Sequence, residues 1–128
     1  MINVIIWNEY YHEREDKHVG ELYPKGIHGC IKDFLEPDKN FSIQTATLDE
    51  PDHGLTEERL KNTDVLVWWG HKAHQKVEDS VVDRIQGRVL EGMGLLVLHS
   101  GHHSKIFKRM MGTTANIRWA ERGEKERV

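Results

Sequence analysis

The sequence predicts an α/β protein in which a mainly parallel sheet lies between two layers of helices, a three-layer α/β/α sandwich. Short apolar segments rich in Val, Ile and Leu alternate along the chain with segments whose apolar residues recur at helical spacing. The apolar segments are almost continuously hydrophobic, which is typical of parallel strands buried on both faces. The 128 residues fit one domain, residues 1–128.

The first half of the chain predicts a strand, a polar loop and a helix. Residues 2–7, "INVIIW", are the first strand, and the polar residues that follow form a loop long enough to have a function. A helix is expected between Pro24 and Pro37, with Cys30 as a small buried side chain. The apolar face of that helix is expected to hold Ile27, Ile31, Phe34 and Leu35.

The second half continues the alternation. Residues 41–48 alternate apolar and polar side chains, which predicts a less buried strand near an edge of the sheet. A turn at "PDHG" leads to a short helix with Thr56 as its N-cap. The remaining expected elements are a strand at 64–69, a helix at 75–91, a strand at 95–99 and a helix at 102–111.

The last predicted strand raises a question of coverage, because "LLVL" is too uniformly apolar for an exposed sheet edge. Three arrangements would protect it. Residues 116–120, "NIRWA", would add one short strand, a second copy would pair with it in a homo-oligomer, or the domain is incomplete at its C-terminal end.

Composition excludes several classes of partner. The net charge of −3 and the scattered Lys and Arg residues do not form the basic face of a nucleic-acid-binding protein. No apolar run approaches the roughly 18 residues of a membrane span, and the start lacks the features of a signal peptide. A cytoplasmic protein is therefore expected. The first strand is not followed by a Gly-rich turn, so no nucleotide cofactor is expected.

Histidines follow three of the predicted strands. Because the carboxyl ends of parallel strands meet at one edge of a sheet, where ligands bind near the topological switch point, these residues should share one pocket. The groups concerned are Asn8, Glu9, His12 and Glu13 after the first strand, His71 and His74 after the third, and His99, His102 and His103 after the fourth. His28, near the start of a helix, should face the same edge, whereas His18 and His53 are expected to be solvated.

Such a pocket suits acid–base or metal-assisted chemistry, because imidazole titrates near neutral pH and binds divalent metals when it is neutral. The catalytic candidates are His99, His71, Glu9 and His12. The substrate-binding candidates are Asn8, His28, His74 and Trp69. A divalent metal, zinc foremost, would be held by His71, His99 and His103, although no HExxH or CxxC motif is present.

Ser100 is the alternative, as the nucleophile of a hydrolase. A nucleophile elbow has small residues two positions to either side, but Leu98 and His102 flank Ser100. Centring the elbow on His99 places Gly101 after it, so that an imidazole occupies the position of the nucleophile.

The segments "WNEYYHE", "YPKGIHGCIKDFL", "DVLVWWGHKAH" and "LLVLHSGHHSKIF" together resemble the trehalose-utilisation (ThuA-like) family. The resemblance implies a flavodoxin-like, class I glutamine-amidotransferase-like fold without the amidotransferase Cys. It also implies a cytoplasmic role in the metabolism of trehalose or a related disaccharide or keto-sugar. Family members are longer, so the chain resembles their N-terminal part.

The expected function is therefore carbohydrate utilisation through a pocket lined by His and Glu, with a small-molecule carbohydrate as partner. Two alternatives stay open. One is a non-catalytic module that binds a sugar or a metal, and the other is a Ser hydrolase. Whether the chain is an enzyme is left open by the sequence.

Overall fold

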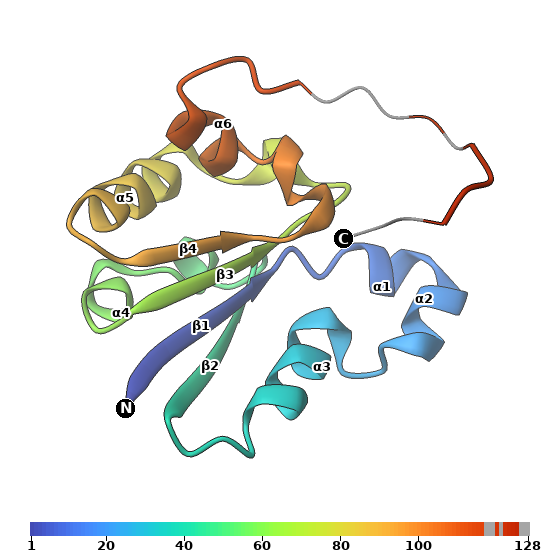
Figure 1. Ribbon diagram of the computed structural model, residues 1–128, viewed down its shortest axis with the longest axis horizontal. Helices are drawn as coiled ribbons and strands as arrows, with labels where there is room; N and C mark the ends of the chain where they lie inside the picture. Colours follow the sequence, from blue (N-terminus) through green and yellow to red (C-terminus); the bar gives the residue numbers. More distant parts are fainter. Residues whose placement is uncertain (117–119, 121, 126–128) are drawn as a thin grey trace.

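Four parallel strands form one sheet with the order β2-β1-β3-β4 in the computed structural model, which describes residues 1–116, 120 and 122–125 (Figure 1). The strands are β1 (Ile2–Asn8), β2 (Phe41–Thr47), β3 (Val65–Trp69) and β4 (Gly94–Val97). The α-helices are α1 (His12–Glu15), α2 (Lys17–Leu22), α3 (Gly26–Leu35), α4 (Glu57–Lys61), α5 (Asp79–Leu90) and α6 (Lys105–Met111). Three 3₁₀ helices are η1 (Pro51–Gly54), η2 (His74–Lys76) and η3 (His99–His103). The predicted α/β fold class is confirmed.

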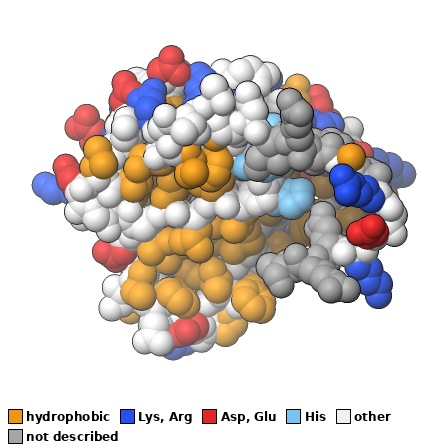
Figure 2. All heavy atoms as spheres, turned by 45° about the horizontal axis from the view of Figure 1, so that its top comes forward, with side chains coloured by type: hydrophobic (Ala, Val, Ile, Leu, Met, Phe, Trp, Pro, Cys, Tyr) orange, Lys and Arg blue, Asp and Glu red, His pale blue; other side chains and the backbone are white. Residues whose placement is uncertain are grey.

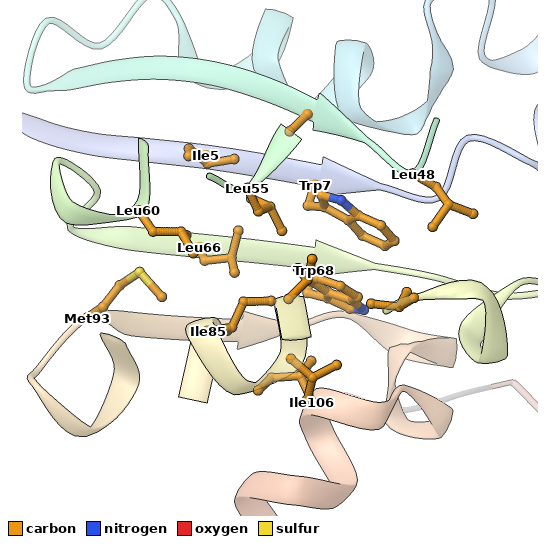
Figure 3. Close-up of a cluster of buried hydrophobic side chains, with 14 of the residues drawn as sticks. Ile5, Trp7, Leu48, Leu55, Leu60, Leu66, Trp68, Ile85, Met93 and Ile106 are labelled. Carbon is orange, nitrogen blue, oxygen red and sulfur yellow. The ribbon is translucent and has the colours of Figure 1, made fainter. Parts of the chain in front are cut away.

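The larger core lies between the sheet and α4, α5 and α6. Trp7 of β1 and Trp68 of β3 stack there with ring centroids 3.8 Å apart, and both are almost fully buried (Figure 3). Leu60 of α4, Ile85 of α5 and Ile106 of α6 cover the same face of the sheet. Burial of these large apolar side chains is the main stabilising contribution to the domain.

A smaller core lies on the opposite face, where α3 packs against the sheet. Val4, Ile6 and Val67 are buried there, and Ile31 and Leu35 of α3 pack against them. Successive residues of a strand face opposite sides, so Trp68 enters the larger core while the half-buried Trp69 faces the α3 side. The sheet is thus covered on both faces, which confirms the three layers.

The chain path creates a topological switch point between β1 and β3. From β1 the chain crosses to β2 on one side, and after α4 it returns past β1 to form β3 on the other side. The order 2-1-3-4 is the flavodoxin-like one for these strands, and ligands of such sheets bind beyond the carboxyl ends at the switch. Asn8 pairs with Trp69 in the register of β1 and β3, so the switch lies directly beyond these two residues.

The two edges of the described sheet are β2 and β4. β2 is only partly buried, as its alternating pattern predicted. On β4, Leu96 is 51% exposed. One face of the molecule shows a broad area of hydrophobic side chains, with histidines at its margin (Figure 2). Most of the strand predicted at 116–120 lies outside the described residues, and the predicted homo-oligomer stays a prediction.

Several local predictions are corrected by the structure. The polar segment after β1 contains the short helices α1 and α2, and α6 begins at Lys105, after η3, rather than at residue 102. Phe34 is 81% exposed and Cys30 is exposed, because α3 turns only Ile31 and Leu35 toward the sheet. His53, expected to be solvated, is buried.

The N-cap prediction for the short helix is confirmed. The hydroxyl of Thr56 accepts a hydrogen bond from the main-chain N–H of Arg59 at 3.3 Å at the start of α4. Among the described residues, none of the helices combines the length and the apolar character needed to cross a membrane.

Candidate functional site

The turn after β1 is organised by Asn8, which is fully buried. Its side-chain oxygen accepts a hydrogen bond from the main-chain N–H of Tyr10 at 2.8 Å. This contact supports the left-handed backbone of Tyr10, whose φ is 51°, a conformation that is uncommon for a residue with a side chain. The side-chain amide of Asn8 is therefore held toward the loop that follows.

That amide joins Glu13 to His28. The Asn8 nitrogen lies 2.6 Å from Oε1 of the buried Glu13 and 2.9 Å from Nδ1 of His28. Because the amide nitrogen can only donate, His28 Nδ1 accepts, and the ring carries its proton on Nε2. Glu13 Oε1 also accepts from the N–H of Ile27 at 2.8 Å, so it satisfies a free donor in the first turn of α3.

The surroundings keep His28 neutral. Burial lowers the pKa of the imidazole below its ordinary value of 6.5, while the negative charges of Glu13 and Glu50 oppose that shift. Gly26 packs directly against the ring. A Cβ at this glycine would lie 2.4 Å from His28 Cε1, and its φ of +74° already favours glycine.

Glu9 is fully buried, and both of its carboxylate oxygens are occupied. Oε1 accepts the N–H of Lys72 at 2.7 Å, and Oε2 accepts the N–H of Ala73 at 2.8 Å. Both donors belong to residues 70–74, the loop that carries His71 and His74 after β3; we call it the 70–74 loop. The carboxylate thus links the end of β1 to this loop through two charge-assisted hydrogen bonds.

His71 lies within a row of parallel rings. Its ring is stacked on that of His12, with centroids 4.7 Å apart and planes 17° apart, and Trp69 lies on a nearly parallel plane with its centroid 6.0 Å away. Partial desolvation lowers the pKa of His71 from 6.5, and positive charge on His12, Lys72 or His99 lowers it further. The charge of Glu9 acts in the opposite direction. The ring is exposed, and its lowered pKa keeps it mostly neutral near pH 7.

His99 begins η3 with a left-handed backbone, φ 41°, directly after the extended Leu98. This is the sharp strand-to-helix turn expected from the Gly101 spacing, and the residue at the turn is an imidazole. A non-glycine residue in this region carries backbone strain of order 1 kcal/mol or more, which proteins keep mainly at functional sites. The exposed His99 is therefore held at the turn after β4 by the surrounding structure.

A second group of rings lies beside the first. His102 and His103 have centroids 4.1 Å apart, and His103 lies 6.0 Å from His74. His102 Nδ1 donates to the carbonyl of His99 at 2.8 Å. The Nε2 atoms of His102 and His74 are buried and have no hydrogen-bond partner among the described residues. Burial lowers the pKa values of His74 and His103, and positive charge on neighbouring histidines lowers both further.

Ser100 has a structural contact rather than an exposed hydroxyl. It is buried, and its Oγ donates to the carbonyl of Gly70 at 2.8 Å. Gly70 is itself closely surrounded, because a Cβ there would lie 3.2 Å from His74 Nδ1 and 3.5 Å from Glu9 Oε2. The start of the 70–74 loop is therefore fixed by β4 as well as by β1.

The structure brings most of the predicted site residues to one edge of the sheet. We call the following set the histidine edge: His12, Trp69, His71, His74, His99, His102 and His103. Asn8, Glu13 and His28 form a separate hydrogen-bonded network beside it, and Glu9 lies beneath the 70–74 loop. The catalytic and substrate-binding roles of these residues stay predictions.

The predicted metal site also stays a prediction. Within the described part of the chain, no three His, Cys, Asp or Glu side chains lie close enough together to hold a metal ion. Of the predicted ligands, His71 stacks on His12 and His103 lies beside His102, whereas the His99 ring belongs to neither pair. Neutral imidazole is the form that binds metal.

Sequence reasoning missed the roles of His53, Gly26 and Gly70. Nδ1 of His53 lies 2.7 Å from the carbonyl of Leu48, and its Nε2 accepts the N–H of Glu78 at 3.0 Å, so the ring joins the β2–α4 connection to the start of α5. No sequence pattern marks this contact. The two glycines have a weak signal, since each lies within four residues of a site histidine that it contacts.

A parallel α/β sheet with polar residues gathered beyond its carboxyl ends defines the chain as an α/β protein whose ligand site is expected at the switch point. A family model described as trehalose utilisation (ThuA) matches residues 3–127, so the chain belongs to the ThuA family. No curated protein matched the sequence. The family indicates involvement in trehalose utilisation.

Proposed function

We propose that this protein acts on trehalose, a related disaccharide or its keto form at the histidine edge, with His99 and His71 as acid–base groups. The observation that carries the proposal is the strained backbone of His99 at the turn after β4, together with the exposed ring of His71, whose pKa is lowered. An imidazole with a pKa near or below neutrality can take a proton from a sugar hydroxyl or return one to a leaving oxygen.

His12 and Trp69 would support this chemistry by contact. His12 stacks on His71 and restricts its orientation, and the half-buried Trp69 offers a flat ring beside it. Aromatic rings of this kind suit the apolar faces of sugars. A pocket closed around a sugar, and a cytoplasmic place of action, belong to the same proposal.

Metal assistance is the second version of the proposal. It would use the predicted ligands His71, His99 and His103, although no three such side chains of the described residues lie close enough together to hold an ion. A bound divalent ion would polarise a sugar oxygen or a water. A module that binds a sugar without turnover is the alternative from another class.

The test uses the whole chain purified without a histidine tag. Trehalose and its keto form are titrated by calorimetry and incubated with the protein, and turnover is followed by chromatography of the sugars. We expect binding of at least one sugar, and turnover that is lost in His99→Ala and kept in His18→Ala, a matched change at an exposed histidine on α2.

Each other outcome of these assays excludes one version of the proposed function. Binding without turnover supports the binding module, and the absence of both binding and turnover contradicts the proposal. Elemental analysis of the same sample, followed by melting curves with added Zn²⁺ or Mn²⁺, tests the metal version, because a metal that binds the folded state raises the melting temperature.

A further inference from the structure

Glu9 is one of the predicted catalytic candidates, and Ser100 is the nucleophile of the alternative hydrolase hypothesis. Both are buried, and the side-chain hydrogen bonds of both are with main-chain atoms of the 70–74 loop. Glu9 comes from the end of β1 and Ser100 from the turn after β4, whereas the loop follows β3, which lies between these strands. The loop is therefore held from both sides.

We propose that Glu9 and Ser100 are positioning residues that together fix the 70–74 loop and so set the places of His71 and His74 at the histidine edge. This inference rests on the proposed function only for the statement that these two rings act on substrate. The contacts themselves belong to the fold.

Glu9 and Ser100 bind different parts of the 70–74 loop. Glu9 accepts the N–H groups of two consecutive residues, Lys72 and Ala73, with one oxygen each, so the carboxylate fits the loop as a two-point clamp. Ser100 donates to the carbonyl at the other end of the loop, Gly70. Between these points lies His71, and directly after them lies His74, so the main chain that carries either ring cannot shift without loss of one of these hydrogen bonds.

The glycine at position 70 is part of the same arrangement. A Cβ there would lie 3.2 Å from His74 Nδ1, which is tight, and 3.5 Å from Glu9 Oε2, which is an ordinary contact, so a larger residue would press mainly on the His74 ring. The charge of Glu9 has a second effect, because it opposes the lowering of the pKa values of His71 and His74.

The first experiment compares Glu9→Gln with the wild type by NMR, using amide exchange and histidine ring titration. A glutamine amide cannot accept both N–H groups, so we expect the amides of Lys72 and Ala73 to exchange about tenfold faster or more. Loss of the negative charge should also lower the pKa values of His71 and His74 further. Glu15→Gln is the matched control, since Glu15 is an exposed carboxylate near the side chain of Lys72.

Unchanged exchange and unchanged ring titration in Glu9→Gln would overturn the positioning role of Glu9. Changes of equal size in Glu15→Gln would also overturn it, because they would show that any nearby charge has the same effect. Both readouts need no substrate, so they distinguish a failure of this inference from a failure of the proposed sugar chemistry.

The second experiment is Ser100→Ala, assayed for turnover and for amide exchange in the 70–74 loop. A positioning residue predicts faster loop exchange and a partial loss of turnover, since Glu9 still holds the loop. Complete loss of turnover with loop exchange unchanged would instead show that Ser100 is a nucleophile, and would overturn the inference.

Discussion

The buried carboxylates and the exposed imidazoles at the carboxyl edge of the sheet differ in how their polar atoms are used. Glu9 is fully buried and gives both oxygens to main-chain N–H groups, and Glu13 gives one oxygen to Asn8 and to the first turn of α3. His71 and His99 are exposed, and neither ring has a hydrogen bond among the described residues. The carboxylates therefore form the frame of the site, and the imidazoles are left available for a ligand.

This difference separates stability from function. A buried carboxylate that satisfies main-chain donors is costly to remove, because the donors then lack a partner. An exposed ring contributes little to the stability of the folded state, so its removal should affect only ligand binding or turnover. Substitution of a buried carboxylate should therefore mainly reduce stability, and substitution of an exposed imidazole should mainly reduce turnover.

The largest expected effect is that of His99→Ala on turnover. A general acid or base contributes about 10²–10⁴-fold to a rate, so turnover of trehalose or its keto form should fall by that factor. The free energy of unfolding should change by no more than about 0.5 kcal/mol, as for most exposed positions. Steady-state assays and urea unfolding of the same samples give both values. Turnover equal to that of the wild type would remove His99 from the chemistry.

Glu9→Ala should instead have its main effect on stability. Two N–H groups in and beside the core lose their acceptor, so we expect a loss of about 3 kcal/mol in the free energy of unfolding. Urea unfolding measures the loss, with Glu15→Ala as the control at an exposed carboxylate. A loss below about 0.5 kcal/mol would show that water replaces the carboxylate and that Glu9 is not part of the frame.

Gly26→Ala tests how tightly the frame encloses His28. Alanine at φ +74° costs about 1 kcal/mol anywhere, and here its Cβ would also lie 2.4 Å from the ring. Gly112→Ala is the matched control, because its φ of +67° is similar and no atom of the described residues lies within 4 Å of the added Cβ. Thermal unfolding should therefore show a larger loss for Gly26→Ala. Equal losses would mean that the ring moves aside freely.

The smallest expected effect is a pH dependence of stability. The pKa values of His28, His71, His74 and His103 are all lowered from 6.5 in the folded state. The unfolded chain therefore takes up protons first as the pH falls below about 6.5, and stability decreases until the folded-state pKa values are passed.

Melting temperatures should accordingly fall as the pH is lowered from about 6.5 to about 5, whereas these histidines should contribute no slope well above pH 6.5. His28→Gln should reduce the decrease, because it removes one of the histidines whose pKa is lowered in the folded state. Melting temperatures that rise on acidification would contradict the lowered pKa values.

The sequence predicted the strands to within one or two residues, because buried parallel strands are recognisable as short apolar runs. It did not predict α1 and α2, since residues 12–22 have no apolar periodicity and their short helices depend on local capping, such as that by Asp16. Phe34 was assigned to the core by its spacing alone. Its exposure is decided by the face that α3 turns to the sheet, which carries Ile31 and Leu35.

The location of the site could be predicted from the sequence. Which of its residues are buried in the fold and which are exposed could not. The strand ends of a parallel sheet place Glu9, His71 and His99 at one edge, and the structure agrees. Which of them is buried depends on main-chain donors 63 and 64 residues away from Glu9, and no sequence pattern reports those contacts. His53 was missed for the same reason, because its partners are main-chain atoms.

The most direct measurement for the account as a whole is a joint determination of stability and turnover for His99→Gly. Glycine adopts a positive φ without strain, so removing the imidazole from the turn at φ 41° should raise the free energy of unfolding by about 1 kcal/mol. Turnover of trehalose or its keto form should be lost in the same sample. A variant that is less stable than the wild type and retains full turnover would contradict the account.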